Sequence, residues 1–281
     1  MALSLKIRPR RNRKSHTVRE MLAETNLTID QMVLPVFLTS GTKKKDPIGT
    51  LPGIHRYSVD VLIQEMDRWV KLGICSFALF PQIPDDLKDH TGSESLNRSG
   101  LFPNAIFEIK KKFPEVVLFT DIALDPYSSD GHDGIVKNGQ ILNDETVEVL
   151  AQMAIVQAQA GADYVAPSDM MDGRIGAIRN SLDKAKYTNT GIMAYSAKYA
   201  SSFYGPFRDA LGSAPKSGDK KTYQMDYRNR REALREVKLD IQQGADIVMV
   251  KPALSYLDII REVKNLVAVP VAAYNVSGEY A

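Results

Sequence analysis

Two lysines, Lys198 and Lys251, each come directly after a run of mostly apolar residues, 191–197 and 246–250. If these runs are neighbouring strands, the two ammonium groups lie close together, and repulsion and loss of water both favour the neutral amine. A neutral lysine amine attacks the carbon of a ketone or aldehyde and forms an imine. The two lysines together therefore predict a Schiff-base lyase or a condensing enzyme. For either lysine alone, a charge that reaches the rim or pairs with a carboxylate is an equally good interpretation.

The segment after Lys198 could bind an acidic substrate. Residues 201–208 are rich in aromatic side chains and end in an arginine, and residues 212–227 carry glycine, serine and lysine without an apolar period. A loop of this length inside a compact domain is usually a lid or a disordered segment. Its polar side chains could clamp a carboxylate, and a mobile solvated loop is the alternative. The candidates for such a clamp are Arg208, Lys220, Lys221 and Gln224.

The elements that must position these residues alternate along the chain. Seven apolar runs read as strands, at 34–38, 74–80, 116–124, 163–167, 191–197, 246–250 and 269–274. Between most of them lie stretches with helical periodicity, two of which stop at Gly161 and Gly244, as helices often do. Nearly continuous apolar strands that alternate with helices predict a parallel sheet covered on both faces.

A β/α barrel of the TIM type is the fold that this pattern favours, because seven units exceed the need of a small doubly wound domain. No Gly-x-Gly-x-x-Gly motif follows the first run, which weakens the Rossmann-like alternative. Barrel enzymes carry their reacting groups at the carboxyl ends of strands, where Lys198 and Lys251 fall. A closed (β/α)8 barrel has eight strands, so we expect the eighth to be missing from the 281 residues given.

Composition restricts the class of protein. The chain is 44% hydrophobic and 25% charged with a net charge of +2, which is typical of a soluble globular protein. No apolar run of about 18 residues is present, and no apolar segment of the secretory type follows the basic N-terminus. Cys75 is the only cysteine, so we expect a reducing, cytoplasmic setting, without a disulfide or a cysteine-rich zinc site within one chain.

The N-terminal segment, residues 1–25, is read as an extended arm in front of a barrel domain at 26–281. Six of the nine residues from Lys6 to Lys14 are basic, which raises the question of nucleic-acid binding. The rest of the chain offers neither a basic face nor an aromatic stacking motif. We therefore expect no nucleic-acid partner, and an arm that docks on a neighbouring subunit.

Three segments resemble the signature of a known family. Residues 196–210, 248–252 and 274–281 are similar to porphobilinogen synthase, also called 5-aminolevulinate dehydratase, and the similarity runs on through 119–121 and 166–173. The resemblance implies a lyase that condenses two molecules of 5-aminolevulinate to porphobilinogen, with loss of two waters, in haem and chlorophyll biosynthesis. It implies a homo-octamer in which the arm embraces a neighbouring barrel, and a lid that closes near residues 209–229.

The resemblance also implies roles for single residues. Lys251 would hold the first substrate, which becomes the propionate side, and Lys198 would hold the acetate-side substrate. Ser277 would bind the propionate-side carboxylate. Many members have arginine at the position of Lys220, where this chain offers a point charge instead. The residues implied to bind the acetate-side carboxylate are Arg208, Lys220 and Gln224.

Four further side chains are implied to lie near the reacting groups. Asp121 and Ser168 would lie close to the two amines and handle protons or orient the substrates. Tyr204 and Tyr274 would pack against the substrates. For both tyrosines, core packing with a hydrogen-bonded hydroxyl is an equally good interpretation.

Metal use is where the chain departs from the zinc-dependent members of this family. Ala123, Asp125 and Asp133 stand where those members have three cysteines. Alanine cannot bind a metal, and carboxylates prefer magnesium or potassium to zinc, so no zinc is expected and an active-site cation at the two aspartates is an open possibility. Glu236 matches the glutamate that anchors an allosteric hydrated magnesium in the magnesium-stimulated members.

Two other functions remain open from the sequence. One is a class I aldolase on the same type of barrel, which would work through a single lysine. The other is a truncated, non-catalytic paralogue that only assembles. Trapping of two lysines, one lysine or none separates the three.

Overall fold

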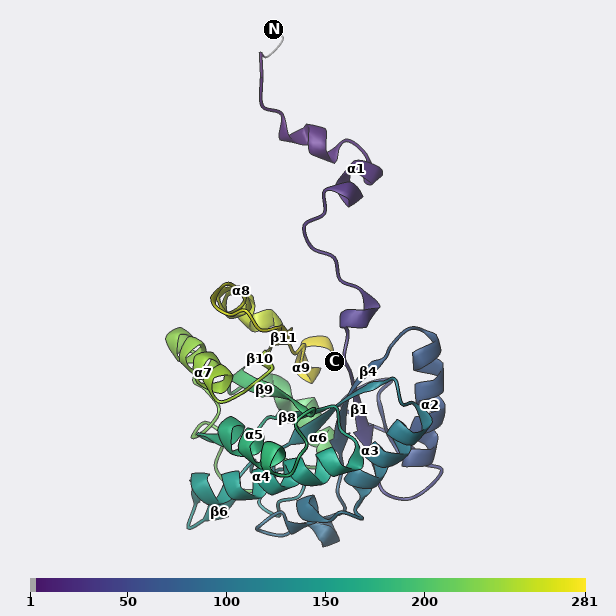
Figure 1. Ribbon diagram of the computed structural model, residues 1–281, viewed down its shortest axis with the longest axis vertical. Coiled ribbons are helices and arrows are strands. Elements are labelled where there is room, and N and C mark those ends of the chain that lie inside the picture. The colour runs from purple at the N-terminus through teal and green to yellow at the C-terminus, as the bar shows by residue number, and fades with distance from the viewer. Residues whose placement is uncertain (1–3) are drawn as a thin grey trace. The chain divides into compact units, whose positions relative to one another are not determined.

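The computed structural model describes residues 4–281 and divides after Met32 into two units, Met1–Met32 and Val33–Ala281 (Figure 1). The first unit contains η1 (Pro9–Arg13), α1 (His16–Met21) and η2 (Ile29–Gln31). The hydroxyl of Ser15 caps α1 by accepting a hydrogen bond from the amide of Val18 at 3.3 Å. None of the residues in these three elements is buried, and residues 4–32 therefore form no core of their own.

The second unit is built on seven parallel strands in the positions that the sequence predicted. In the sheet they stand in chain order and each pairs with the next, which excludes the strand reversal of a doubly wound sheet. This is the β/α barrel. Within residues 4–281 no pairing joins the first and last of the seven strands. They are β1 (Leu34–Leu38), β4 (Ser76–Pro81), β5 (Val117–Ile122), β8 (Tyr164–Pro167), β9 (Gly191–Lys198), β10 (Ile247–Lys251) and β11 (Val271–Ala273).

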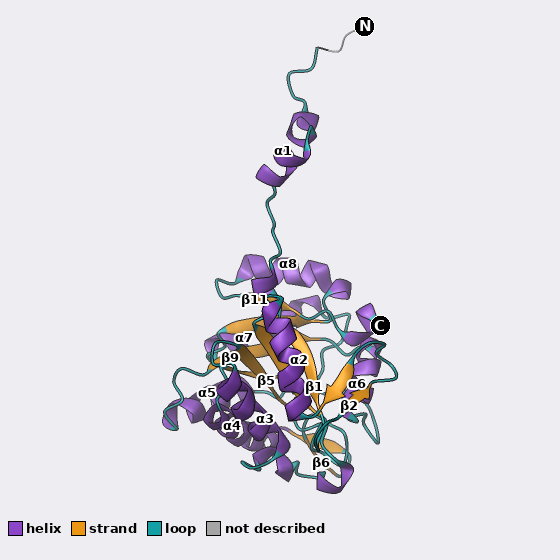
Figure 2. Ribbon diagram, turned by 90° about the vertical axis from the view of Figure 1, so that its right-hand side faces the viewer, coloured by secondary structure: helices purple, strands orange, loops and turns teal. Residues whose placement is uncertain are grey.

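Helices connect these strands and lie around them (Figure 2). The predicted glycine stops are confirmed: Gly161 ends α4 with φ +109°, and Gly244 follows α7 with φ +106°. None of the helices within residues 4–281 is long and apolar enough to cross a membrane. The helices between strands are α2 (Val59–Lys71), α3 (Leu101–Lys112), α4 (Asn143–Ala160), α5 (Arg174–Lys184), α7 (Arg230–Gln242) and α8 (Leu257–Leu266).

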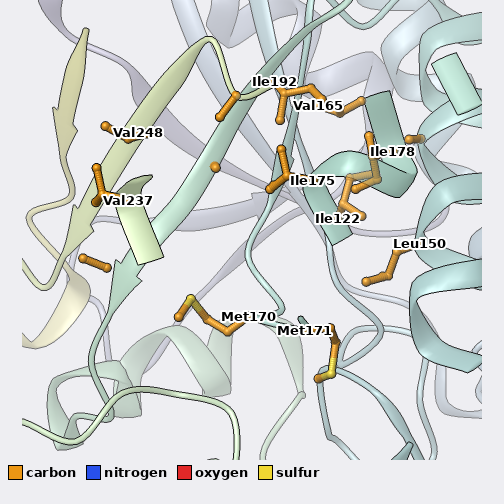
Figure 3. Close-up of a cluster of buried hydrophobic side chains, with 14 of the residues drawn as sticks. Ile122, Leu150, Val165, Met170, Met171, Ile175, Ile178, Ile192, Val237 and Val248 are labelled. Atoms are coloured by element: carbon orange, nitrogen blue, oxygen red, sulfur yellow. The ribbon is translucent and has the colours of Figure 1, made fainter. Parts of the chain in front are cut away.

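Two layers of apolar side chains hold the barrel together. Outward side chains of the strands pack against the helices, for example Val165 and Ile192 against Ile178 of α5 (Figure 3). Inward side chains of the same strands, among them Phe119 and Met249, form a separate cluster inside the barrel. Alternation along each strand, with a period of two residues, therefore decides which side chains reach the interior.

Several short elements were not predicted. β2 (Lys45–Pro47) and β3 (His55–Tyr57) extend the sheet beyond β1, and β6 (Ile135–Lys137) pairs with β7 (Gln140–Leu142) as a separate hairpin. Three-residue strands are too short to show a period in the sequence. The segment after Lys198 also contains helix α6 (Gly205–Leu211), so the first three residues of the predicted lid at 209–229 are helical and the remainder, 212–229, is irregular.

Candidate active site

Lys198 and Lys251 are the last residues of β9 and β10 and lie directly opposite each other in the sheet. Both side chains are buried. The strand-end position predicted for each lysine is therefore confirmed, although each belongs to its strand rather than following it.

Strand alternation places three of the predicted site residues in the barrel interior. Asp121, Ser168 and Lys251 each lie two residues beyond an inward side chain: Phe119, Ala166 and Met249, respectively. A period of two residues keeps Asp121 and Lys251 on the inner face of their strands, and Ser168, one residue beyond the end of β8, continues the same alternation. They therefore meet at the carboxyl end of the barrel, where this fold carries its chemistry.

Lys198 reaches the same interior through an irregularity in β9. Met193 and Tyr195 point inward, so regular alternation would turn Ala197 inward and Lys198 outward. Between β9 and β10, however, two residue steps on β10 (Val248 to Val250) match three on β9 (Ala194 to Ala197). This β-bulge moves Ala197 into the outer cluster and brings Lys198 to the inner face.

The amine of Lys251 lies in a cage of aromatic rings. Burial, followed by the charge of Lys198, lowers the pKa of Lys251 to about 7. Among the residues that the structure describes, no hydrogen bond or ion pair is made by its Nζ. Lys251 is therefore neutral in a large fraction of molecules near neutral pH. The ring centroids nearest to its Nζ belong to Tyr274 at 4.3 Å, Phe207 at 4.9 Å, Tyr195 at 5.1 Å and Tyr204 at 5.2 Å.

The amine of Lys198 has the opposite surroundings. Its Nζ donates to the backbone oxygen of Ser168 and lies 3.2 Å from Oδ2 of Asp133. Lys198 thus has an anionic partner that Lys251 lacks. The two neighbouring lysines therefore differ in their electrostatic surroundings: Lys198 lies next to a carboxylate and Lys251 lies among aromatic rings.

A second ion-paired lysine lies beside Lys198. Nζ of Lys220 is 2.5 Å from Oδ1 of Asp133 and 3.2 Å from Oδ2 of Asp125. Burial acts to raise the pKa of Asp133, but the ammonium groups of Lys198 and Lys220 overcome it and lower that pKa. Burial likewise acts to lower the pKa of Lys220, and the two aspartates raise it instead. The aspartates proposed as cation ligands are therefore already bound to ammonium groups.

Asp121 is a buried carboxyl group close to both reacting lysines. Burial and then the charge of Asp125 raise its pKa to about 7, against a hydrogen bond from Ser168 and the charges of Lys198 and Lys251. Its Oδ1 has no hydrogen-bond partner in the described part of the chain. The amide of Gln157 on α4 donates to its backbone oxygen at 2.9 Å. A carboxyl group that is half protonated near neutral pH suits proton transfer.

The predicted carboxylate clamp is partly assembled. Lys220 and Gln224 are buried, and Oε1 of Gln224 has no partner among residues 4–281. Arg208 on α6 is partly exposed, and no ion pair or hydrogen bond of its guanidinium occurs in the described residues. Lys221 instead points outward and pairs with Asp219 at 3.4 Å. The structure thus separates Lys221 from the other candidates.

Ser277 lies at the start of α9 (Ser277–Tyr280), next to the aromatic segment. Its Oγ accepts from the amide of Phe207 at 3.0 Å and donates to the carbonyl of Phe203 at 3.2 Å. The hydroxyl of Tyr204 donates to the carbonyl of Tyr199 at 2.6 Å, so its ring faces Lys251 while its polar end bonds the backbone. These contacts of Tyr204 agree with core packing and a hydrogen-bonded hydroxyl. The ring nearest to the Lys251 amine belongs to Tyr274.

The lid segment is fastened by residues that the sequence analysis did not single out. Nε2 of His132 donates to the carbonyl of Ser217 at 2.9 Å, and its Nδ1 lies 3.1 Å from the hydroxyl of Tyr223. At Gly131 an added Cβ would lie 2.2 Å from the carbonyl oxygen of Ala214, so only glycine permits this approach. In the sequence, Gly131 directly before His132 and Asp133 was the one signal that could have predicted this close approach of the lid backbone.

Glu236 lies on α7, in the wall of a cavity of about 1010 Å³ whose lining includes neither Lys198 nor Lys251. Glu232 and Asp172 line the same cavity, together with residues of the lid. Burial raises the pKa of Glu236, and nearby carboxylates act in the same direction, whereas Arg174 acts against them. Within residues 4–281 no three His, Cys, Asp or Glu side chains are grouped as direct ligands of one metal ion. A hydrated magnesium, which needs only one or two carboxylates, still fits Glu236.

Comparison with known proteins gives a consistent result. The family described as delta-aminolevulinic acid dehydratase matches residues 6–281. The delta-aminolevulinic acid dehydratase of Bradyrhizobium diazoefficiens is 56% identical over 281 residues, which cover 100% of this chain and 80% of that protein. The protein of the same name from Chlamydia pneumoniae is 52% identical over 280 residues, covering 100% of this chain and 84% of that protein.

A solved structure is similar over nearly the whole chain. It is the porphobilinogen synthase of Toxoplasma gondii in complex with the reaction product porphobilinogen. The TM-score is 0.97 at 50% sequence identity, and the match covers 99% of this chain and 80% of the other.

Replacing Lys198 by methionine tests the electrostatic origin of the low Lys251 pKa. The variant removes the nearest positive charge and releases Asp133 from one ammonium group, so both changes raise the pKa of Lys251 above about 7. Acetylation of Lys251 by a short pulse of acetic anhydride over a pH series, read by peptide mass spectrometry, should then shift its midpoint to higher pH.

The matched control is Lys221→Met, which removes an exposed lysine paired with Asp219. Its midpoint for Lys251 should equal that of the unmodified protein. A midpoint that stays the same or falls in Lys198→Met would contradict the electrostatic explanation.

Proposed function

The chain belongs to the delta-aminolevulinic acid dehydratase family, and we propose on this premise that it condenses two molecules of 5-aminolevulinate to porphobilinogen with release of two waters. The observation that carries the assignment is the pair of buried lysines at the ends of adjacent strands, facing one interior. Imine formation needs a neutral amine, which the surroundings of Lys251 supply. The protein is thus a hydro-lyase of tetrapyrrole synthesis.

Lys251 reacts first in this proposal. Its neutral Nζ attacks the ketone carbon of the first substrate, a C–N bond forms, and the ketone oxygen leaves as water when the carbinolamine becomes an imine. Asp121, which has a pKa of about 7, donates the proton that the leaving oxygen requires and can take one back in a later step. Ser168, which acts to lower the pKa of Asp121, orients this carboxyl group in the proposal. Ser277 holds the carboxylate of the first substrate, the propionate side, once its hydroxyl turns from the carbonyl of Phe203.

Lys198 forms the second imine, with the acetate-side substrate. The carboxylate of that substrate binds Arg208, Lys220 and Gln224, two of which are already buried at the site. The Lys220 ammonium group must turn from Asp125 and Asp133 toward the substrate for this to happen. The rings of Tyr204 and Tyr274 enclose the first substrate beside Lys251.

We propose magnesium as the cation and no zinc. Ala123 offers no donor atom, and the oxygen ligands at Asp125 and Asp133 suit magnesium or a monovalent ion, which would have to replace the lysine contacts there. Glu236 would anchor a hydrated magnesium in its cavity, where further carboxylates add negative charge. An ion at Glu236 supplies positive charge among these carboxylates and takes no part in the imine chemistry.

Assembly into a cytoplasmic homo-octamer is the remaining part of the proposal. The N-terminal elements bury no residue of their own, which supports an arm that packs on another subunit. Sedimentation that gives the mass of one chain would contradict it. The single cysteine, Cys75, is free and suits a reducing compartment. Some relatives, such as that of Selaginella martensii, are named as chloroplastic.

A single-lysine aldolase is the function that competes most directly. It would leave the second buried lysine and its ion pairs without a role. Family membership and the opposed lysines favour the two-lysine reaction.

Borohydride reduction in the presence of 5-aminolevulinate tests the function. Reduction converts an imine to a stable secondary amine, so peptide mapping should show the adduct on Lys251, and on Lys198 when the second substrate is trapped as well. Lys251→Met should lose at least about a thousandfold of the activity, because the first covalent anchor is gone. A folded protein without an adduct on either lysine would overturn the proposal, and an adduct on Lys251 alone, under every condition, would favour the aldolase.

Glu236→Gln tests the magnesium site. The neutral amide should weaken magnesium binding at least about tenfold, measured by titration calorimetry, and remove magnesium stimulation of activity. Because the pKa of Glu236 is raised, binding should also be lost on acidification at a higher pH than for an ordinary carboxylate. Glu145→Gln, an exposed carboxylate on α4, is the control. Unchanged affinity in Glu236→Gln would place the magnesium elsewhere.

A further inference from the structure

Glu279 joins two segments that carry the binding groups for one substrate. Its carboxylate accepts from the amide of Leu254 at 2.7 Å through Oε1, and from the amides of Val276 at 2.5 Å and Ala253 at 3.4 Å through Oε2. Leu254 and Ala253 lie just after the end of β10, and Val276 lies just before α9. One side chain thus bridges the loop after Lys251 and the segment that begins with Ser277.

We propose that Glu279 is a positioning residue that fixes the span between Lys251 and Ser277, and thereby selects the chain length of the keto acid that binds first. This inference rests on the proposed function, in which the keto carbon of that acid binds Lys251 and its carboxylate binds Ser277. An acid that is bound to Lys251 through its keto carbon and to Ser277 through its carboxylate must match the distance between these two side chains. In 5-aminolevulinate two methylene groups separate the keto carbon from the carboxylate carbon.

The bridge depends on the carboxylate itself. No lysine, arginine or histidine forms an ion pair with Glu279 in the part of the chain that the structure describes, so backbone N–H groups are its partners. Hydrogen bonds to a charged acceptor are about twice as strong as neutral ones. The amide of a glutamine offers one acceptor oxygen, and its NH2 group would face an N–H donor. Glutamine therefore loses the charged acceptor and at least one of the three hydrogen bonds, which weakens the bridge.

Contacts on the other side of α9 prevent it from compensating by a shift. A Cβ added to Gly278 would lie 2.6 Å from the Cα and the carbonyl oxygen of Phe203, so the backbones already touch there. Ser277 is bonded to Phe207 and Phe203 on the same side. α9 is thus held against the aromatic segment, and the carboxylate of Glu279 sets its distance from the loop after Lys251.

The test uses keto acids that differ only in the number of methylene groups between ketone and carboxylate. Levulinate has two, acetoacetate has one and 5-oxohexanoate has three. Each acid is trapped on Lys251 by borohydride, and the concentration that gives half of the maximal adduct is measured by peptide mass spectrometry. The unmodified protein should prefer levulinate over both others.

In Glu279→Gln the half-saturating concentration of levulinate should rise about tenfold, with the maximal adduct retained at saturation, because anchoring is weakened and the amine is untouched. The preference over 5-oxohexanoate should fall, since the span is no longer fixed. Glu262→Gln is the matched control: Glu262 lies on α8, pairs with Arg230, and its loss should change neither quantity. Thermal unfolding of each variant reports whether the fold is retained.

If Glu279→Gln does not fold, Glu279→Asp provides the test, because its carboxylate is one methylene shorter and cannot keep all three hydrogen bonds at their present lengths. The same loss of chain-length preference is expected. An unchanged preference in a folded variant, or an equal loss for all three acids, would overturn this inference. The unmodified protein shows whether a negative result concerns this inference or the proposed function. If the unmodified protein forms no adduct with 5-aminolevulinate, the proposed function itself fails.

Discussion

Two ammonium groups that share one buried space determine much of the architecture at the carboxyl end of the barrel. Lys198 and Lys251 lie opposite each other, and neither burial nor their mutual repulsion favours two charges there. The neighbouring groups reduce this cost, because they differ between the two lysines. Lys198 pairs with Asp133 and donates to a backbone oxygen, whereas the Lys251 amine lies among four aromatic rings and forms no ion pair within the described residues. The same residue type can thus take two roles in one reaction, because burial and neighbours differ.

The β-bulge in β9 is the backbone feature on which this arrangement depends. Without the additional residue, the side chain of Lys198 would point toward the outer helices, where Ala197 packs instead. The sequence predicted the strand, because an apolar run between helical segments is a strong signal. It could not predict the bulge, because a run that is apolar on both faces hides which residues point inward.

The sequence predicted the barrel more completely than the site. All seven strands and the glycine ends of α4 and α7 follow from local patterns, whereas the three-residue strands such as β6 and β7 have no pattern long enough to read. The ion pairs of Lys220 lie across 87 and 95 residues of sequence. The sequence predicted that Lys220 binds the substrate carboxylate and that Asp125 and Asp133 are candidate ligands of a cation. Only the folded structure shows that Lys220 pairs with both aspartates.

These ion pairs limit what can bind as the second substrate. A carboxylate that binds Lys220 removes the ammonium group from Asp125, and an unpaired buried charge is costly. A simple anion would therefore gain one ion pair and break another. 5-Aminolevulinate carries a carboxylate and an ammonium group, so in the proposed reaction it can supply the positive charge that Asp125 and Asp133 lose. The charge pattern of the site thus matches an amino acid better than a simple keto acid.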